Sequence, residues 1–198
     1  MDEPIVILAF PRTGSSMVAG IFKNHGVFTG HCYGPSPRIP TGSIEAIGLK
    51  RILKADYPQT IDELKEFKEG FREKIESVMK ADGYKEGPWL AKHAAIYWPI
   101  WDEFCPKFVC VRRNFDAVIR SNVASNMAGM QGKRLEKAWE LNLYEMQKLH
   151  DRLDAPWIDS DKVVRGNYSS LQDAFDYCGI EFNRKMANDF INPRHWHY

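Results

Sequence analysis

The amino-acid sequence predicts an α/β fold, a P-loop-type three-layer sandwich in which a central parallel sheet carries helices on both faces. Two observations lead to this prediction. Residues Ile5–Phe10 form an uninterrupted apolar run, which is typical of a strand buried on both faces of a parallel sheet. Further short apolar segments then alternate with longer segments of helical periodicity. A chain of 198 residues, 44% of them apolar, is expected to form one domain over residues 1–198.

The elements after the first strand are assigned from periodicity, from capping residues and from the Gly and Pro that interrupt them. In chain order they are a helix over Met17–His25, a short strand over Val27–His31, a loop over 34–42, a helix over Ser43–Leu53, a helix capped by Asp62 that extends to Val78, strands over Trp89–Lys92 and Lys107–Val111, helices over 114–127 and Arg134–Leu153, a last strand at either Trp157–Asp159 or Val163–Val164, and a helix over Ser170–Tyr177.

Composition and patterning exclude several classes of protein. The formal net charge of +1 argues against a large basic surface for nucleic acid. No apolar stretch approaches the roughly 20 residues of a membrane-spanning helix, and residues 2–13 do not resemble a signal peptide. The cysteines and histidines show no spacing typical of a zinc site, so no metal is expected. We therefore expect a soluble, cytoplasmic protein without a nucleic-acid partner.

The loop after the first strand has the composition of an anion site. Its sequence is Pro11-Arg12-Thr13-Gly14-Ser15-Ser16, and ligands of parallel α/β sheets gather at the carboxyl ends of the strands. Gly14 permits a tight turn, the amides that follow it open a helix, and Arg12 adds a forked cation suited to phosphate or sulfate. The alternative is a turn with a helix cap, but the position after a buried strand favours the anion site.

A second candidate anchor follows the strand at 107–111. Arg113 lies at the carboxyl end of this strand, and Ser121 comes eight residues later, which is about two helical turns. Both side chains can therefore reach one bound group. Taken alone, the pair is explained equally well by a surface arginine and a helical serine.

Taken together, the loop and the second anchor resemble the superfamily of sulfotransferases that use 3′-phosphoadenosine-5′-phosphosulfate (PAPS), and the chain is similar to a small bacterial-type member. The resemblance implies transfer of a sulfuryl group from PAPS, with release of 3′-phosphoadenosine-5′-phosphate (PAP). It also implies that Arg12, Thr13, Gly14, Ser15 and Ser16 hold the 5′-phosphosulfate, and that Arg113 and Ser121 hold the 3′-phosphate.

Three further segments extend the resemblance along the chain. Gly87–His93 resembles a family segment that ends in a lysine before the second anchor. Asn167-Tyr168-Ser169 stands where the family has Tyr-Glu-Asp-Leu, so the match there is partial and puts the adenine contact of Tyr168 in doubt. Phe190–Arg194 resembles the short bacterial-type ending, in which the arginine approaches the nucleotide.

The resemblance also implies roles in an in-line transfer. Arg12 would neutralise the leaving oxygen, and Lys92 would add positive charge near the transferred group. The general base is either His93, which follows Lys92, or Glu45, which belongs to a Gly-x-x-Glu element. The acceptor, a small molecule or a carbohydrate, is expected beneath the 34–42 loop and helix 43–55. Tyr97, Trp98 and Trp101 either stack on it or pack in the core.

Two other functions remain open from the sequence. A P-loop small-molecule kinase fits the fold, but the GxxxxGK(S/T) lysine is absent, which disfavours hydrolysis of ATP or GTP. A non-catalytic PAP-binding or scaffold protein on the same fold is the second alternative, because a fold alone does not establish activity. Dependence on magnesium would distinguish the kinase, and binding without transfer would distinguish the scaffold.

Overall fold

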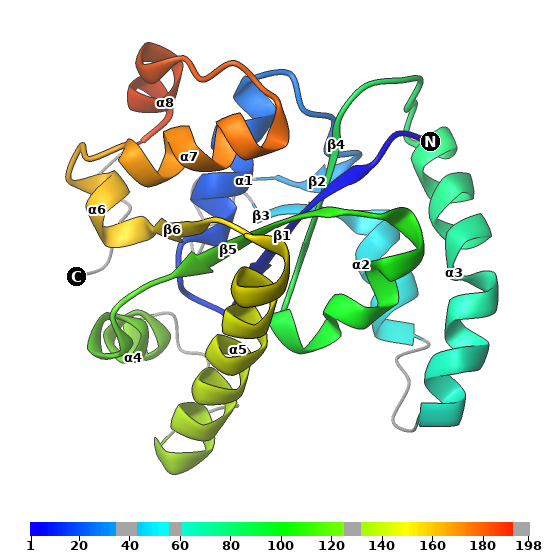
Figure 1. Ribbon diagram of the computed structural model, residues 1–198, viewed down its shortest axis with the longest axis horizontal. Coiled ribbons are helices and arrows are strands. Elements are labelled where there is room, and N and C mark those ends of the chain that lie inside the picture. Colours follow the sequence, from blue (N-terminus) through cyan, green and yellow to red (C-terminus); the bar gives the residue numbers. More distant parts are fainter. Residues whose placement is uncertain (35–42, 56–60, 125–131, 192–198) are drawn as a thin grey trace.

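The main sheet has four strands and is parallel throughout, as the sequence predicts. The computed structural model describes residues 1–34, 43–55, 61–124 and 132–191 (Figure 1). The strands lie in the order β4-β1-β5-β6, and each neighbouring pair is parallel. Their bounds are β1 (Pro4–Ala9), β4 (Trp89–His93), β5 (Lys107–Arg112) and β6 (Trp157–Asp159). A second, two-stranded sheet pairs β2 (Cys32–Tyr33) with β3 (Ser43–Ala46).

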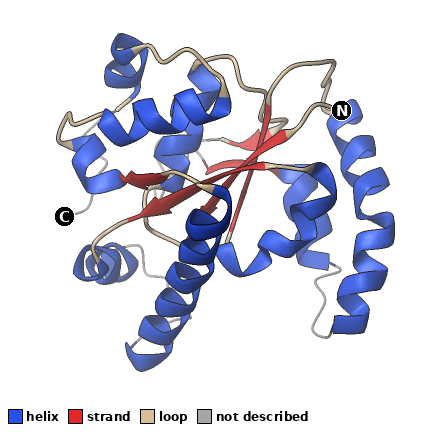
Figure 2. Ribbon diagram, viewed as in Figure 1, coloured by secondary structure: helices blue, strands red, loops and turns tan. Residues whose placement is uncertain are grey.

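Helices cover both faces of the main sheet, which confirms the three-layer sandwich (Figure 2). The helices are α1 (Ser15–Asn24), α2 (Ile47–Ala55), α3 (Ile61–Ala81), the 3-10 helix η1 (Ala95–Phe104), α4 (Phe115–Ala124), α5 (Gly132–Leu153), α6 (Ser160–Val164), α7 (Ser169–Cys178) and α8 (Arg184–Phe190). Among the residues described, none of these helices is long and apolar enough to cross a membrane.

Alternation along β1 explains why its residues are apolar without interruption. Ile5 and Ile7 pack in one core cluster with α1, α7 and α8, whereas Val6 and Leu8 pack in another with α3, η1 and α5. Successive side chains of a strand point to opposite faces, so a strand between two helical layers needs apolar residues at every position.

The register of the sheet brings the carboxyl ends of its strands to one edge. Leu8 pairs with His93, Ala9 with Val111, and Arg112 with Asp159. The loop after β1, the residues after β5 and the start of α6 therefore lie at the same edge, where ligands of such sheets bind.

The structure corrects the predictions for two segments on the amino-terminal side of β4. Residues 43–46 form strand β3 rather than the start of a helix, because Ile44 and Ala46 turn alternate side chains into the core. The helix there begins only at Ile47. In the predicted strand Val27–His31, only Phe28 forms a bridge, with Trp89. The predicted loop falls mostly outside the described residues, at 35–42.

Two other boundaries differ from the predictions. Between the alternatives for the last strand, Trp157–Asp159 is correct, and Val163–Val164 belongs to α6. Asp62 lies within α3 rather than at its cap, because α3 already includes Ile61. The end of the helix predicted over 114–127 lies outside the described residues.

Asn142 of α5 fixes the chain where it leaves β4. Its Oδ1 accepts a hydrogen bond from the backbone N–H of Ala95 at 2.9 Å, and its Nδ2 donates to the carbonyl of Ala138 at 2.8 Å. The side chain is buried, with the residue 4% exposed. Asn142 therefore satisfies an N–H at the start of η1, where helical amides have no acceptor within the helix.

We predict that Asn142→Ala lowers the free energy of unfolding by about 1–3 kcal/mol, because the Ala95 N–H loses its acceptor in a buried position. Chemical denaturation measures the difference. The matched control is Gln147→Ala on the same helix, where the side chain is exposed and bonds only Asp151, with an expected change below about 0.5 kcal/mol. Equal effects of the two substitutions would contradict the prediction.

Candidate functional site

The loop between β1 and α1 has an unusual backbone conformation, which a buried hydrogen bond stabilises. Arg12 and Gly14 both have positive φ angles, 71° and 90°. The buried hydroxyl of Thr13 donates to the carbonyl of Phe10 at 2.7 Å and closes the turn. Glycine tolerates this region, whereas arginine is strained there, and such strain gathers at functional sites. The first amides of α1, at Ser15 and Ser16, open from this turn and favour an anion.

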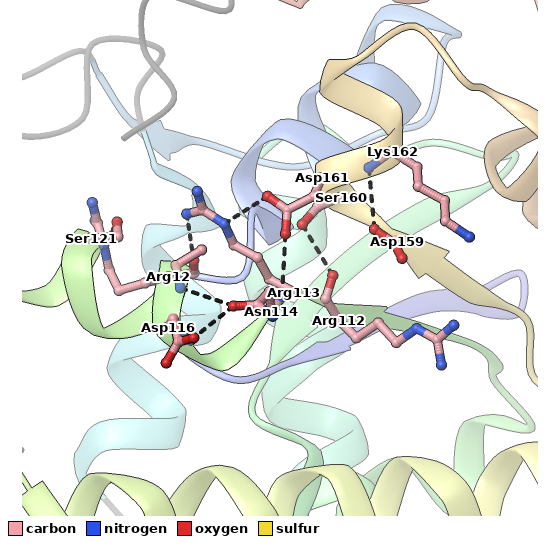
Figure 3. Close-up of polar contacts among 11 residues, drawn as sticks. Arg12, Arg112, Arg113, Asn114, Asp116, Ser121, Asp159, Ser160, Asp161 and Lys162 are labelled. Atoms are coloured by element: carbon pink, nitrogen blue, oxygen red, sulfur yellow. Dashed lines mark hydrogen bonds and ion pairs between the residues drawn. The ribbon is translucent and has the colours of Figure 1, made fainter. Parts of the chain in front are cut away.

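Arg12 connects this loop to the second anchor, 109 residues further along the chain. Its Nε donates to Ser121 Oγ at 3.0 Å, and Ser121, on α4, is only 2% exposed. Figure 3 shows the Arg12 side chain beside Ser121. The structure therefore brings together the two segments that the sequence singled out separately.

Arg113 contacts the backbone of Arg12 and is almost completely buried. Its side chain is 2% exposed, and its Nη1 donates to the carbonyl of Arg12 at 3.3 Å. Its Nε forms an ion pair with Asp161 Oδ1 at 3.1 Å, while Asp161 Oδ2 accepts the N–H of Asn114 at 3.3 Å (Figure 3). Sequence reasoning did not identify Asp161. Its signal is its place just after β6, at the same edge as the two arginines.

The electrostatics of this cluster favour an anionic ligand. Burial lowers the pKa of the Arg12 guanidinium, and the positive charge of Arg113 lowers it further. Arginine nonetheless stays protonated at neutral pH, so two cations stand close together in a partly dehydrated place. Two guanidinium groups beside a helix N-terminus form a donor set that fits phosphate or sulfate.

Lys92 and His93 leave β4 in different directions. Lys92 Nζ donates to Ser16 Oγ at 2.8 Å, on the α1 side of the sheet. The His93 ring packs against Tyr97 of η1 on the opposite side, with ring centroids 4.4 Å apart and the planes tilted by 35°. Lys92 thus contacts the first turn of α1 directly, whereas His93 lies beside η1 at the same edge of the sheet.

The other predicted site residues are Glu45, Arg194 and Tyr168. Glu45 belongs to β3, and Arg194 falls outside the described residues. Tyr168 immediately precedes α7, whereas Asp161 lies near the start of α6. Its hydroxyl donates to Asn188 Oδ1 at 3.1 Å.

A pocket of about 580 Å³ opens beside Tyr168, and the cluster residues do not line it. Its lining residues are Arg165, Gly166, Asn167, Tyr168, Ser169, Gln172, Phe182 and Arg184.

The aromatic residues after β4 pack mainly in the core. Trp101 is fully buried between Phe71 and Phe104. Trp98 Nε1 donates to Glu145 Oε2 at 2.8 Å and packs against Phe108. For these two tryptophans, the structure thus favours packing over contact with a ligand. Within the described residues, no group of three or more His, Cys, Asp or Glu side chains could hold a metal ion.

Comparison with known proteins identifies the fold. No protein-family model matches the sequence, and no curated protein matches it. Among solved structures, the sulfotransferase domain of the curacin biosynthetic pathway is similar over 94% of this chain and 77% of its own, with a TM-score of 0.60 and 13% identity. The sulfotransferase domain of the Synechococcus PCC 7002 olefin synthase is similar over 98% of this chain and 86% of its own, with a TM-score of 0.59 and 16% identity. The chain therefore has a sulfotransferase-type fold.

We predict that Asp161→Ala destabilises the protein, because it removes the carboxylate that is paired with the buried guanidinium of Arg113. Removing one partner of a buried ion pair costs about 3–5 kcal/mol. Asp161 is itself 18% exposed, so we expect about 2–3 kcal/mol in chemical denaturation. A double-mutant cycle with Arg113→Ala is the control. The double variant should lose less than the sum of the single losses, and strict additivity would show that the pair is not coupled.

Proposed function

We propose that the protein is a sulfotransferase that moves a sulfuryl group from PAPS to a hydroxyl or amine of a small-molecule or carbohydrate acceptor, with release of PAP. The observation that carries the proposal is the hydrogen-bonded cluster of Arg12 and Arg113, which follow β1 and β5, with Ser121 of α4. The nucleotide has anionic groups at its 5′ and 3′ positions, and two separate guanidinium anchors suit such a ligand. The likeness of the fold to sulfotransferase domains supports the same choice.

The two anchors divide the nucleotide between them. Arg12, with the turn and first amides at 13–16, holds the 5′-phosphosulfate, and Arg113 with Ser121 holds the 3′-phosphate. The bond from Arg12 Nε to Ser121 Oγ joins these anchors directly, so the bound groups lie on either side of it. Tyr168 and Arg194 stay predicted nucleotide contacts, and the cytoplasmic location stays a prediction.

Transfer requires charge neutralisation and a base for the acceptor proton. PAPS supplies the sulfur atom, to which the acceptor oxygen or nitrogen bonds as the bond from sulfur to the 5′-phosphate oxygen breaks. Arg12 neutralises the charge that grows on that leaving oxygen, and Lys92, already at Ser16 Oγ, adds a second positive charge. The acceptor proton passes to His93 or to Glu45, and the proposal keeps both.

Calorimetric titration with PAP and with AMP tests the proposal. We expect selective binding of PAP without magnesium, because AMP lacks the 3′-phosphate. Arg113→Ala should weaken PAP binding by about 10- to 100-fold, the range of hydrogen bonds to charged groups, and should leave AMP nearly unchanged. Arg120→Ala, an exposed arginine next to Ser121, is the matched control. Equal loss of PAP and AMP with Arg113→Ala would show that Arg113 is the wrong anchor.

The same titration separates the alternative functions. Preference of the wild-type protein for ATP with magnesium would favour a kinase. Tight binding of PAP without transfer to any acceptor in a screen would favour a non-catalytic nucleotide-binding protein.

Arg12→Ala gives the complementary prediction, because Arg12 is assigned to the 5′ end of the nucleotide. The variant should bind PAP and AMP with similarly reduced affinity. With an acceptor found by screening, its kcat should fall by about 10²–10³-fold, as for other removed charge-stabilising donors. Circular dichroism checks that the fold persists. Transfer by Arg12→Ala at the wild-type rate would remove the central role of this residue.

A further inference from the structure

Asp161 places a carboxylate against the guanidinium that the proposed function assigns to the 3′-phosphate. The distance from Arg113 Nε to Asp161 Oδ1 is 3.1 Å, and the side chains are 2% and 18% exposed. The backbone N–H of Asn114 holds the second carboxylate oxygen at 3.3 Å. Both oxygens are therefore fixed, and the carboxylate stays beside Arg113 rather than turning to solvent.

We propose that Asp161 is a specificity-determining residue, a resident counter-ion that opposes the 3′-phosphate and limits the affinity for nucleotides that carry one. The inference rests on the proposed function, because it assumes that Arg113 receives the 3′-phosphate. Its physical basis is the charge of three neighbouring groups. Arg12 and Arg113 are cations and Asp161 is an anion, so together they carry one net positive charge.

A 3′-phosphate brings more negative charge than this cluster can balance. A phosphate monoester carries about −1.5 to −2 at neutral pH. Arg12 is assigned to the 5′ end of the nucleotide, so Arg113 is the arginine that faces the 3′-phosphate, and the Asp161 carboxylate already offsets its charge. Hydrogen bonds of about 3 Å on two sides of one guanidinium put the phosphate within about 7 Å of the carboxylate. At that distance, in a partly buried place, repulsion weakens binding by about tenfold or more.

The structure also gives a reason for keeping a carboxylate in this place. A buried arginine needs a counter-charge while no nucleotide is bound, and the bond to Nε fixes the orientation of the guanidinium. The same contact thus prepares Arg113 for the phosphate and competes with it. A residue that served only to support Arg113 would do the first and not the second, and the two roles predict opposite effects of removing the charge.

Asp161→Asn separates the two roles, because its Oδ1 can still accept from Arg113 Nε while the negative charge is removed. Its Nδ2 no longer accepts from the exposed N–H of Asn114. The control is Asp159→Asn, two residues earlier, where the carboxylate accepts the N–H of Lys162 as the cap of α6. Asparagine is an equally good cap, so this control removes a nearby charge that is not paired with Arg113. Calorimetry at fixed pH and salt compares PAP and AMP on the wild type and both variants.

We expect Asp161→Asn to tighten PAP binding by about tenfold and to change AMP binding by less than about twofold. Asp159→Asn should change both by less than about twofold. Weaker or unchanged PAP binding by Asp161→Asn would overturn the inference and leave Asp161 a support for Arg113. Equal tightening by Asp159→Asn would overturn it as well, since general charge would then suffice.

A second variant and the wild-type titration distinguish failure of this inference from failure of the proposed function. If Asp161→Asn does not fold, Asp161→Ser supplies a smaller neutral acceptor, and the same selective tightening of PAP is expected. The wild-type titration is read first: failure to prefer PAP over AMP would overturn the proposed function itself. Selective PAP binding by the wild type without the Asp161→Asn effect would overturn only the role of Asp161.

Discussion

The contact between Arg113 and the backbone of Arg12 is the constraint on which the carboxyl edge of the sheet depends. Arg113 reaches the carbonyl of Arg12, and the lowered pKa of Arg12 reflects burial together with the charge of Arg113. Such a pair persists only if neighbouring groups offset the repulsion. Asp161 provides the negative charge, and Ser121 accepts a hydrogen bond from Arg12. The three charged residues follow β1, β5 and β6, which are adjacent in the sheet.

Burial of the sheet on both faces holds this cluster of side chains in place. Two helical layers fix the strands, so their carboxyl ends hold side chains from distant parts of the chain in register. The positive φ of Arg12 is maintained by the buried Thr13 and its bond to Phe10, which compensates the strain of a non-glycine residue there. A functional group on a rigid element is positioned more accurately than one on a loop alone. The loop at 11–14 gains that accuracy from β1 and α1, which it joins.

The first strand, the turn at Gly14 and the strand before Arg113 could be predicted from the sequence, because each has a local signal. The apolar run at 5–10 and the turn at Gly14 are such signals, and an arginine after a buried strand is another. Asp161 was missed because β6 has only three residues, and its apolar pattern did not distinguish 157–159 from 163–164. Residues 43–46 were assigned to a helix because the pairing of β3 with β2 is a tertiary interaction, which local propensity does not report.

The alternation of β4 bears on how transfer would be arranged. An in-line displacement needs the attacking and leaving atoms on opposite sides of the transferred group. Lys92 contacts Ser16 on the α1 side, whereas His93 packs against Tyr97 of η1 on the other side. Consecutive strand residues thus place a cation on the α1 side of the sheet and an imidazole on the η1 side. If His93 is the base, the acceptor must approach from η1. If Glu45 is the base, it must approach from β3, so the position of a bound acceptor would decide between them.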